Sequence, residues 1–278
     1  MGADMKSLRS RIKSVDSTLH LTKAMGLVAS SKIRRATINM NQGREYAAAV
    51  NDVIGALIDS PECAKCPYLT DHTSQENELR THLIVIAGDR GLAGGYNANV
   101  FRLARQHLGE GVSVSPIGKR ACDRFGAGAA SAEKYTLTQA NELAARLCDG
   151  FAAGEYDRVG IIWTKYISMM TQEATLTWLL PLRREEIMRT EGKMRAGMIF
   201  EPDELTILNL AVREFVAGRI AAAVRESFAS EVAARRCAMD SAGKNAQQMI
   251  DELQLEYNRA RQGAITQELT EIVAGANA

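Results

Sequence analysis

The C-terminal quarter of this 278-residue chain sets its architecture. Residues 203–278 have the sequence DELTILNLAVREFVAGRIAAAVRESFASEVAARRCAMDSAGKNAQQMIDELQLEYNRARQGAITQELTEIVAGANA. The stretch contains no proline, and good helix formers fill most of it. Pro202, Asp203 and Glu204 form a helix start signal, because proline and acidic residues are favourable in a first helical turn. Roughly seventy helical residues span about 105 Å, whereas a domain of this size has a radius of gyration of roughly 19 Å. We therefore predict a helix that projects and finds its partner outside the domain.

A second long helix is predicted for the first sixty residues, since no proline occurs before Pro61. Its apolar or small residues recur at alternating intervals of three and four, the spacing of a coiled-coil seam. Gly26 stands in that seam, and we expect a partner helix to approach closely there, although simple tolerance of a glycine is the alternative. The seam consists of Ile12, Val15, Leu19, Thr22, Gly26, Ala29, Ile33, Ala36, Met40, Gly43, Ala47, Val50, Ile54 and Leu57.

The C-terminal helix carries a matching seam. It starts with large apolar residues, narrows to Ala234, Ala238 and Ala242, and ends at intervals of three and four with Ile250, Leu253, Tyr257, Ala260 and Ala264. Two terminal helices joined through a domain and carrying matching seams predict a long antiparallel coiled coil. Because the C-terminal helix is the longer one, its tip should extend beyond its partner.

The middle of the chain alternates between strand and helix signals. This alternation predicts a Rossmann-like α/β domain with a mostly parallel sheet. We therefore divide the chain into an N-terminal coiled-coil helix, an α/β foot domain and a C-terminal coiled-coil helix, with bounds 1–59, 60–202 and 203–278. The predicted strands are 83–87, 112–117, 159–163 and 174–180, and the predicted helices are 97–108, 119–125 and 138–151.

Charge is balanced overall but not locally. Lys and Arg total 34 against 33 for Asp and Glu, so net charge favours no class of partner. Residues 1–35 nevertheless carry eight basic side chains against two acidic ones, which suits an acidic partner surface. No apolar run reaches the roughly 18 residues of a membrane span. The N-terminus lacks a signal or transit pattern, which favours a bacterial cytoplasm or a processed organelle protein.

Residues 88–97, GDRGLAGGYN, follow the first predicted strand and could indicate a phosphate site. The pattern is neither G-x-G-x-x-G nor a P-loop, which ends in G-K-[ST]. A tight strand-to-helix turn that lets backbones pack closely is the favoured interpretation.

The cysteines and histidines do not complete a site. Cys63 and Cys66 have the spacing of half a zinc site or of a redox pair, and His72 is nearby, but no fourth ligand is evident. We expect an exposed loop without function there. The remaining cysteines lie in predicted helices, where we expect them to be small buried apolar residues. No catalytic arrangement is visible.

Both ends of the chain and the glycine turn resemble the γ subunit of F-type ATP synthase. RSRIKSV at 9–15 and LTKAMGLVASSK at 21–32 are similar to its N-terminal helix, and DRGLAGGYN at 89–97 is similar to its glycine turn. AAR at 233–235 and EYNRARQGAITQELTEI at 256–272 resemble its C-terminal signature, the most specific of these motifs. The resemblance covers essentially the whole chain.

The resemblance implies a non-catalytic rotating shaft inside a ring of three α and three β subunits. The α/β domain would sit at the foot, near the ε subunit and the membrane c-ring, and proton or sodium flow would turn the shaft. It implies no cofactor, no metal, no nucleic-acid partner and no membrane span of its own. The expected location is peripheral, on the cytoplasmic face of the bacterial inner membrane.

Particular positions match the contact residues of that family. Met25 matches a shaft methionine that faces the acidic lever region of the β subunit, and Lys23 and Arg9 match shaft charges. The other matches are to positions that contact catch loops of the surrounding subunits. The expected subunit-contact residues are Lys23, Met25, Arg235, Gln262, Thr266 and Glu268.

Three departures from the family pattern stand out. Gly26 replaces a larger polar residue, Ala93 replaces a frequent cysteine, and Cys63 and Cys66 lie in a variable region. Light-type thiol regulation is therefore not carried over to this chain. A coiled-coil scaffold that never rotates, and an α/β nucleotide or phosphate enzyme that uses residues 88–97, are the competing hypotheses.

Overall fold

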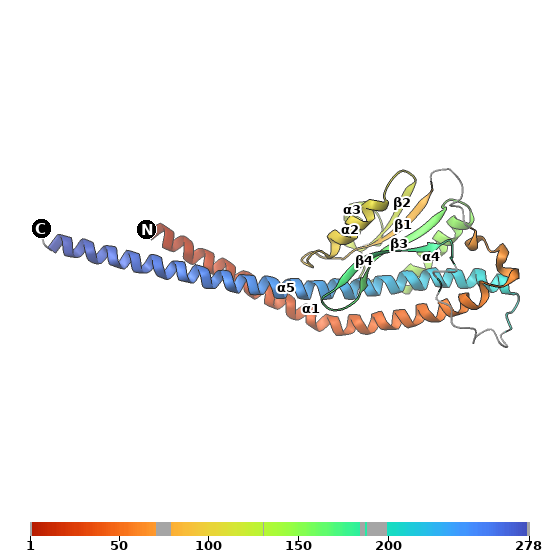
Figure 1. Cartoon of the computed structure of the whole chain (residues 1–278), viewed down its shortest axis with the longest axis horizontal. Helices are drawn as coiled ribbons and strands as arrows, with labels where there is room; N and C mark the ends of the chain where they lie inside the picture. The colour runs from red at the N-terminus through yellow and green to blue at the C-terminus, as the bar shows by residue number, and fades with distance from the viewer. Residues whose placement is uncertain (1, 71–78, 130, 184–186, 188–198, 277–278) are drawn as a thin grey trace. The chain divides into compact units, whose positions relative to one another are not determined.

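The computed structural model describes residues 2–70, 79–129, 131–183, 187 and 199–276. The chain divides into two compact units, each described here by itself. Unit 1 combines residues 1–30 with 235–278, and unit 2 comprises residues 31–234. Two long helices, α1 (Gly2–Leu57) and α5 (Glu204–Ala276), contribute to both units (Figure 1).

The helix α5 begins at the predicted signal. The carboxylate of Asp203 accepts hydrogen bonds from the backbone N–H and the hydroxyl of Thr206, both at 2.8 Å. These bonds satisfy one of the free N–H groups that every helix start leaves open.

The two long helices pair in antiparallel fashion within each unit. In unit 1, a Cβ at Gly26 would lie 3.6 Å from Met239 Cβ, and Leu19 packs with Ala246 and Ile250. In unit 2, Arg44 donates to Glu226 at 2.5 Å, and the Tyr46 hydroxyl donates to Glu214 at 3.1 Å. Residue numbers therefore fall along α5 as they rise along α1, and the predicted antiparallel coiled coil is confirmed. Every residue of the predicted α1 seam is buried or half-buried, as the interval of three and four requires.

A four-stranded sheet forms the centre of unit 2, in the order β2-β1-β3-β4. The strands are β1 (Thr81–Ile86), β2 (Val112–Ile117), β3 (Arg158–Tyr166) and β4 (Gln172–Leu180). β1 is parallel to both β2 and β3, and β4 is antiparallel to β3. The prediction of a mostly parallel sheet is therefore confirmed.

Alternate residues of β1 enter two hydrophobic cores on opposite sheet faces. Ile84 and Ile86 belong to the larger core, shared with α4 (Leu137–Ala152) and with parts of α1 and α5. Leu83 and Val85 face the smaller core, with α2 (Tyr96–His107) and α3 (Lys119–Phe125). The sheet is thus covered on both faces, as parallel strands require.

The predicted boundaries agree closely with the observed ones. The bounds of β2 and α3 are those predicted, whereas β3 and β4 are longer than predicted. The break after α1 contains two short 3₁₀ helices, Pro61–Lys65 and Pro67–Leu69. The division into domains at 59 and 202 stays a prediction.

Candidate functional site

The expected subunit-contact residues all belong to unit 1, on two helices. Lys23 and Met25 lie on α1, and Arg235, Gln262, Thr266 and Glu268 lie on α5. Met25 and Arg235 are half-buried, and the other four are exposed. They do not form one cluster: Lys23 lines a groove between the helices, whereas the last three follow one another near the end of α5.

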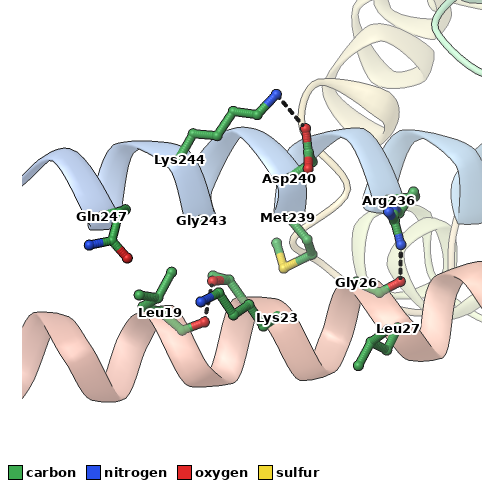
Figure 2. A pocket seen from close by; sticks show the side chains of 11 residues that line it. Leu19, Lys23, Gly26, Leu27, Arg236, Met239, Asp240, Gly243, Lys244 and Gln247 are labelled. Carbon is green, nitrogen blue, oxygen red and sulfur yellow. Dashed lines mark hydrogen bonds and ion pairs between the residues drawn. The ribbon is translucent and has the colours of Figure 1, made fainter.

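A groove of about 500 Å³ lies between α1 and α5 in unit 1. Figure 2 shows it from close by, with side chains of both helices around it. Small residues open it, since Gly26 and Gly243 have no side chains to fill the space. It is lined by Leu19, Thr22, Lys23, Gly26 and Leu27 of α1 and by Arg236, Met239, Asp240, Gly243, Lys244 and Gln247 of α5.

One arginine crosses the interface at the end of the groove. Arg236 Nη1 donates to the carbonyl oxygen of Gly26 at 3.1 Å (Figure 2). It also donates to the Ser30 hydroxyl. A methyl group at Gly26 would lie 3.6 Å from Cβ of Met239, an ordinary van der Waals contact. Helix α5 is therefore in contact with α1 at Gly26, at a spacing that a methyl group would also fit, so the contact does not require glycine.

The rim of the groove is basic. Lys23, Arg236 and Lys244 line it together with a single acid, Asp240. Lys244 bonds to Asp240 at 2.9 Å, and this hydrogen bond lowers the pKa of the Asp240 carboxyl. With three cations and one anion, the groove surface suits an acidic partner, as the local charge of residues 1–35 predicts.

The end of α5 beyond Ala264 is exposed on all sides. Among the residues whose burial is described, Leu253 is the last buried one, and after it Tyr257, Ala260 and Ala264 are half-buried along one face. The Thr266 hydroxyl donates to the carbonyl oxygen of Gln262 at 3.0 Å within the helix. The prediction that the C-terminal tip extends beyond its partner helix is confirmed within unit 1.

In the glycine turn, residues 88–97, the polar side chain of Asp89 is satisfied by groups of the same chain. The Asp89 carboxylate accepts hydrogen bonds from the backbone N–H groups of Lys119, Ala132 and Glu133 and from the Ser131 hydroxyl, at 2.8–3.1 Å. Burial opposes the ionisation of Asp89, but these hydrogen bonds hold its pKa below the usual range. A fixed carboxylate at this place repels phosphate, which supports the interpretation as a strand-to-helix turn.

The prediction of an exposed loop around Cys63 and Cys66 is wrong. Both side chains are fully buried in the larger core, because the 3₁₀ turns that begin at Pro61 and Pro67 direct them inward. Cys66 Sγ donates to Asn209 Oδ1 at 3.2 Å, and burial raises the pKa of its thiol. A buried thiol of raised pKa is a poor redox group.

Other predicted features of the cysteines and histidines have mixed outcomes. Cys148 is buried as expected, whereas Cys122 and Cys237 are only half-buried. His72 lies outside the described residues. Within the described ranges, no three side chains of His, Cys, Asp or Glu come together in a way that could hold a metal ion.

The predicted seam in the middle of α5 does not coincide with the residues that line the groove. Arg236, Met239 and Gly243 line it. Ala234, Ala238 and Ala242 do not line it and are half-buried, as Arg236 and Gly243 also are. A signal was available, because Met239 and Gly243 continue the interval of three and four that leads to Ala246 and Ile250. The nearby alanines at 234, 238 and 242 have a similar spacing and therefore compete with that signal.

Comparison with known proteins gives one consistent family. Residues 4–278 match the protein family described as ATP synthase. The sodium ion specific ATP synthase gamma chain of Acetobacterium woodii is 37% identical over 305 residues, covering 100% of this chain and 99% of that protein. The ATP synthase gamma chain of Ruminococcus albus is 38% identical over 285 residues, covering 97% and 96%.

Two solved structures of mitochondrial ATP synthases contain a chain of the same fold. A chain of the Euglena gracilis mitochondrial ATP synthase has a TM-score of 0.67 at 19% identity and covers 100% of this chain, with 95% of its own length matched. A chain from the central stalk and c-ring of the Tetrahymena thermophila enzyme has a TM-score of 0.60 at 22% identity, with coverage of 80% and 99%.

Proposed function

Because the chain belongs to the family of ATP synthase gamma chains, non-catalytic rotor subunits of the central stalk, we propose that it is the asymmetric shaft of a bacterial ATP synthase. It turns inside a ring of three α and three β subunits. Its rotation couples ion flow through a membrane c-ring to ATP synthesis or hydrolysis at the catalytic sites of that ring.

The antiparallel pairing of α1 and α5 in unit 1 carries this proposal. Two helices held along a continuous seam resist bending better than one, and a shaft must be stiff along its length. The end of α5 beyond Ala264 presents its side chains outward in all directions. Such an end fits a bearing inside a ring, where every side of the shaft meets a neighbour.

The contact residues are the proposed points of engagement with the ring. Lys23 and Met25 would meet acidic segments of the β subunit, and Arg235, Gln262, Thr266 and Glu268 would meet catch loops. Exposed polar contacts contribute about 1 kcal/mol or less each. Contacts of that strength transmit force without locking the shaft in one orientation.

The proposal extends to the remaining partners and to the location, and the same family membership supports both. The ε subunit and the c-ring would bind the α/β foot, and the complex would lie at the cytoplasmic face of the bacterial inner membrane. Among the described residues, none of the helices combines the length and hydropathy needed to cross a bilayer. One relative is named sodium ion specific, but the coupling ion is selected in the c subunit.

Reconstitution with α and β subunits tests the proposal. The chain should assemble with them into a complex that hydrolyses ATP, and a fluorescent bead on the foot should rotate during hydrolysis. Assembly without rotation would support the static scaffold instead. Tight, saturable binding of ATP or NAD by the isolated chain would favour the enzyme hypothesis.

The double variant Arg235→Ala with Glu268→Ala tests the contact residues. Loss of two contacts of about 1 kcal/mol each, about 2 kcal/mol together, should lower ATP turnover of the assembled complex about thirtyfold. The isolated chain should keep its helix content and unfolding midpoint. Arg105→Ala with Glu110→Ala, an exposed pair of the same types in unit 2, is the control, and equal turnover of both double variants would refute the assignment.

A further inference from the structure

Strand β3 continues for several residues beyond the end of its pairing with β1. The pairing of β1 with β3 ends at Val85 and Ile162, so the following residues of β3 have no strand on that side. Helix α5 takes the place of the strand. The Thr164 backbone N–H donates to the Ser227 hydroxyl, and the Ser230 hydroxyl donates to the Thr164 carbonyl oxygen, both at 3.1 Å.

The next residue on the same edge binds a carboxylate of α5. The Tyr166 backbone N–H donates to Glu226 Oε1 at 2.9 Å. Arg44 of α1 donates to the same oxygen at 2.5 Å and to the Tyr166 carbonyl oxygen at 3.2 Å. Glu226 is 4% exposed, so one buried carboxylate joins α1, β3 and α5.

The glycine turn closes around the same helix segment. The Tyr96 hydroxyl donates to the carbonyl oxygen of Ser227 at 3.0 Å. Gly88 leaves room for Glu231, since a Cβ at Gly88 would lie 2.7 Å from the carboxyl carbon of Glu231. Glu231 is 2% exposed and cannot easily move away. The glycine turn therefore packs against α5, and the space beside Gly88 is filled by Glu231 rather than by a ligand.

The polar character of this contact determines what it can do. Apolar side chains can slide or rotate past one another at little cost, whereas buried hydrogen bonds are directional and costly to leave unmade. The α5 segment 226–231 places four buried polar side chains on an otherwise apolar part of the helix: Glu226, Ser227, Ser230 and Glu231. They resist both translation of α5 and rotation about its own axis.

We infer that the α5 segment 226–231, held by Gly88, Tyr96, Thr164, Tyr166 and Arg44, is the joint that transmits torque between the α/β foot and the shaft helix. The inference rests on the proposed function, because a joint of this kind matters only if the shaft turns under load. It also gives the glycine turn Gly88–Asn97 a mechanical role.

Hydrogen exchange of the isolated full chain tests the joint itself. In the double variant Ser227→Ala with Ser230→Ala, the backbone amide of Thr164 should exchange about tenfold faster or more, because it loses its acceptor. Tyr96→Phe removes a single hydroxyl and should have a smaller effect on the same region. Ser241→Ala, an exposed serine of α5, is the matched control and should change neither. Unchanged exchange at Thr164 would refute the joint.

Coupling in the assembled, membrane-bound complex tests the mechanical role. The Ser227→Ala with Ser230→Ala complex should hydrolyse ATP at the wild-type rate but build an ion gradient at least about twofold smaller, because the joint yields under load. Tyr96→Phe should lower the gradient less, and Ser241→Ala should not lower it. A normal gradient in a complex whose Thr164 amide exchanges faster would overturn the inference. Failure of the wild-type chain to rotate would overturn the proposed function instead.

Discussion

The two ends of α5 differ in what surrounds their side chains. From 208 to 233 most side chains are buried against α1 and the sheet, including the polar groups of Glu226 and Ser230. From 254 to 275 nearly all are exposed. One uninterrupted helix therefore has an end that packs against the rest of the chain, the held end (208–233), and an end that is exposed to solvent, the open end (254–275).

The difference shows that helix formation and helix environment are separate properties of the sequence. Both ends of α5 are rich in the same helix-forming residues, and packing against the rest of the chain distinguishes them. In a rotor, the held end is suited to receive force and the open end is suited to meet other subunits.

The largest expected contrast comes from two glutamates of the same helix. Glu226→Ala removes a carboxylate that serves Arg44 and the Tyr166 N–H, and should cost about 3 kcal/mol of unfolding free energy, the low end for a buried pair because Arg44 is half-exposed. Glu268→Ala, at the open end, should change stability by less than about 0.5 kcal/mol. Urea unfolding of the isolated chain measures both, and similar costs would contradict the contrast.

Two leucines of unit 1 sharpen the comparison. Leu253 is 5% exposed and Leu269 is 57% exposed. Leu253→Ala should destabilise the helix pair by about 2 kcal/mol, since it removes a buried side chain from a thin core. Leu269→Ala should leave the unfolding midpoint unchanged. A loss of stability from Leu269→Ala would show that the tip folds back on the chain.

Acid should act on unit 2 through one histidine. His82 is buried between the hydroxyls of Ser113 and Ser115, and desolvation lowers its pKa from 6.5 to about 4. The folded state therefore binds the proton less well than the unfolded state does. The contribution of neutral His82 to the free energy of unfolding is therefore complete above about pH 6.5 and is lost as the pH falls toward about 4.

The expected loss is about 2 kcal/mol between about pH 7 and pH 5. Unfolding midpoints measured across this range should fall in the wild type and fall less in His82→Gln. An equal decline in both proteins would assign the acid sensitivity to other groups.

The smallest effect concerns two glycines of α1. Gly26→Ala should stabilise the isolated chain by about 1 kcal/mol, since alanine is the better helix former and its methyl group fits at 3.6 Å. Gly43→Ala in unit 2 should gain less, because its methyl group would lie 3.2 Å from Arg225 Cδ. Thermal unfolding compares them, and a destabilised Gly26→Ala would contradict the observed spacing.

Much of the architecture was predictable because its signals are periodic. The α1 seam repeats over fourteen positions with a single alternating interval, so no other face of that helix competes with it. The α5 start was predictable from Asp203, whose carboxylate caps the helix. The alternation of strands and helices predicted the order of the central elements.

The remaining features depend on tertiary packing. The middle of α5 has alanine at several neighbouring positions, so its sequence does not reveal that Met239 lines the groove and that Ala238 does not. The burial of Cys63 and Cys66 follows from 3₁₀ turns in a polar segment. The joint at Thr164 arises because β1 ends before β3 does, and no local pattern records the relative lengths of two strands.

The open end of α5 also affects how the chain behaves before it assembles with other subunits. Ile265, Leu269, Ile272 and Val273 expose their aliphatic side chains there. Before assembly, a newly made copy therefore exposes an apolar helix surface. Such a surface promotes self-association, and the exposed helix is accessible to proteases. Cells that make this chain in excess of the other subunits of the ATP synthase complex should accumulate aggregates or clipped fragments, so matched production of the subunits should protect it.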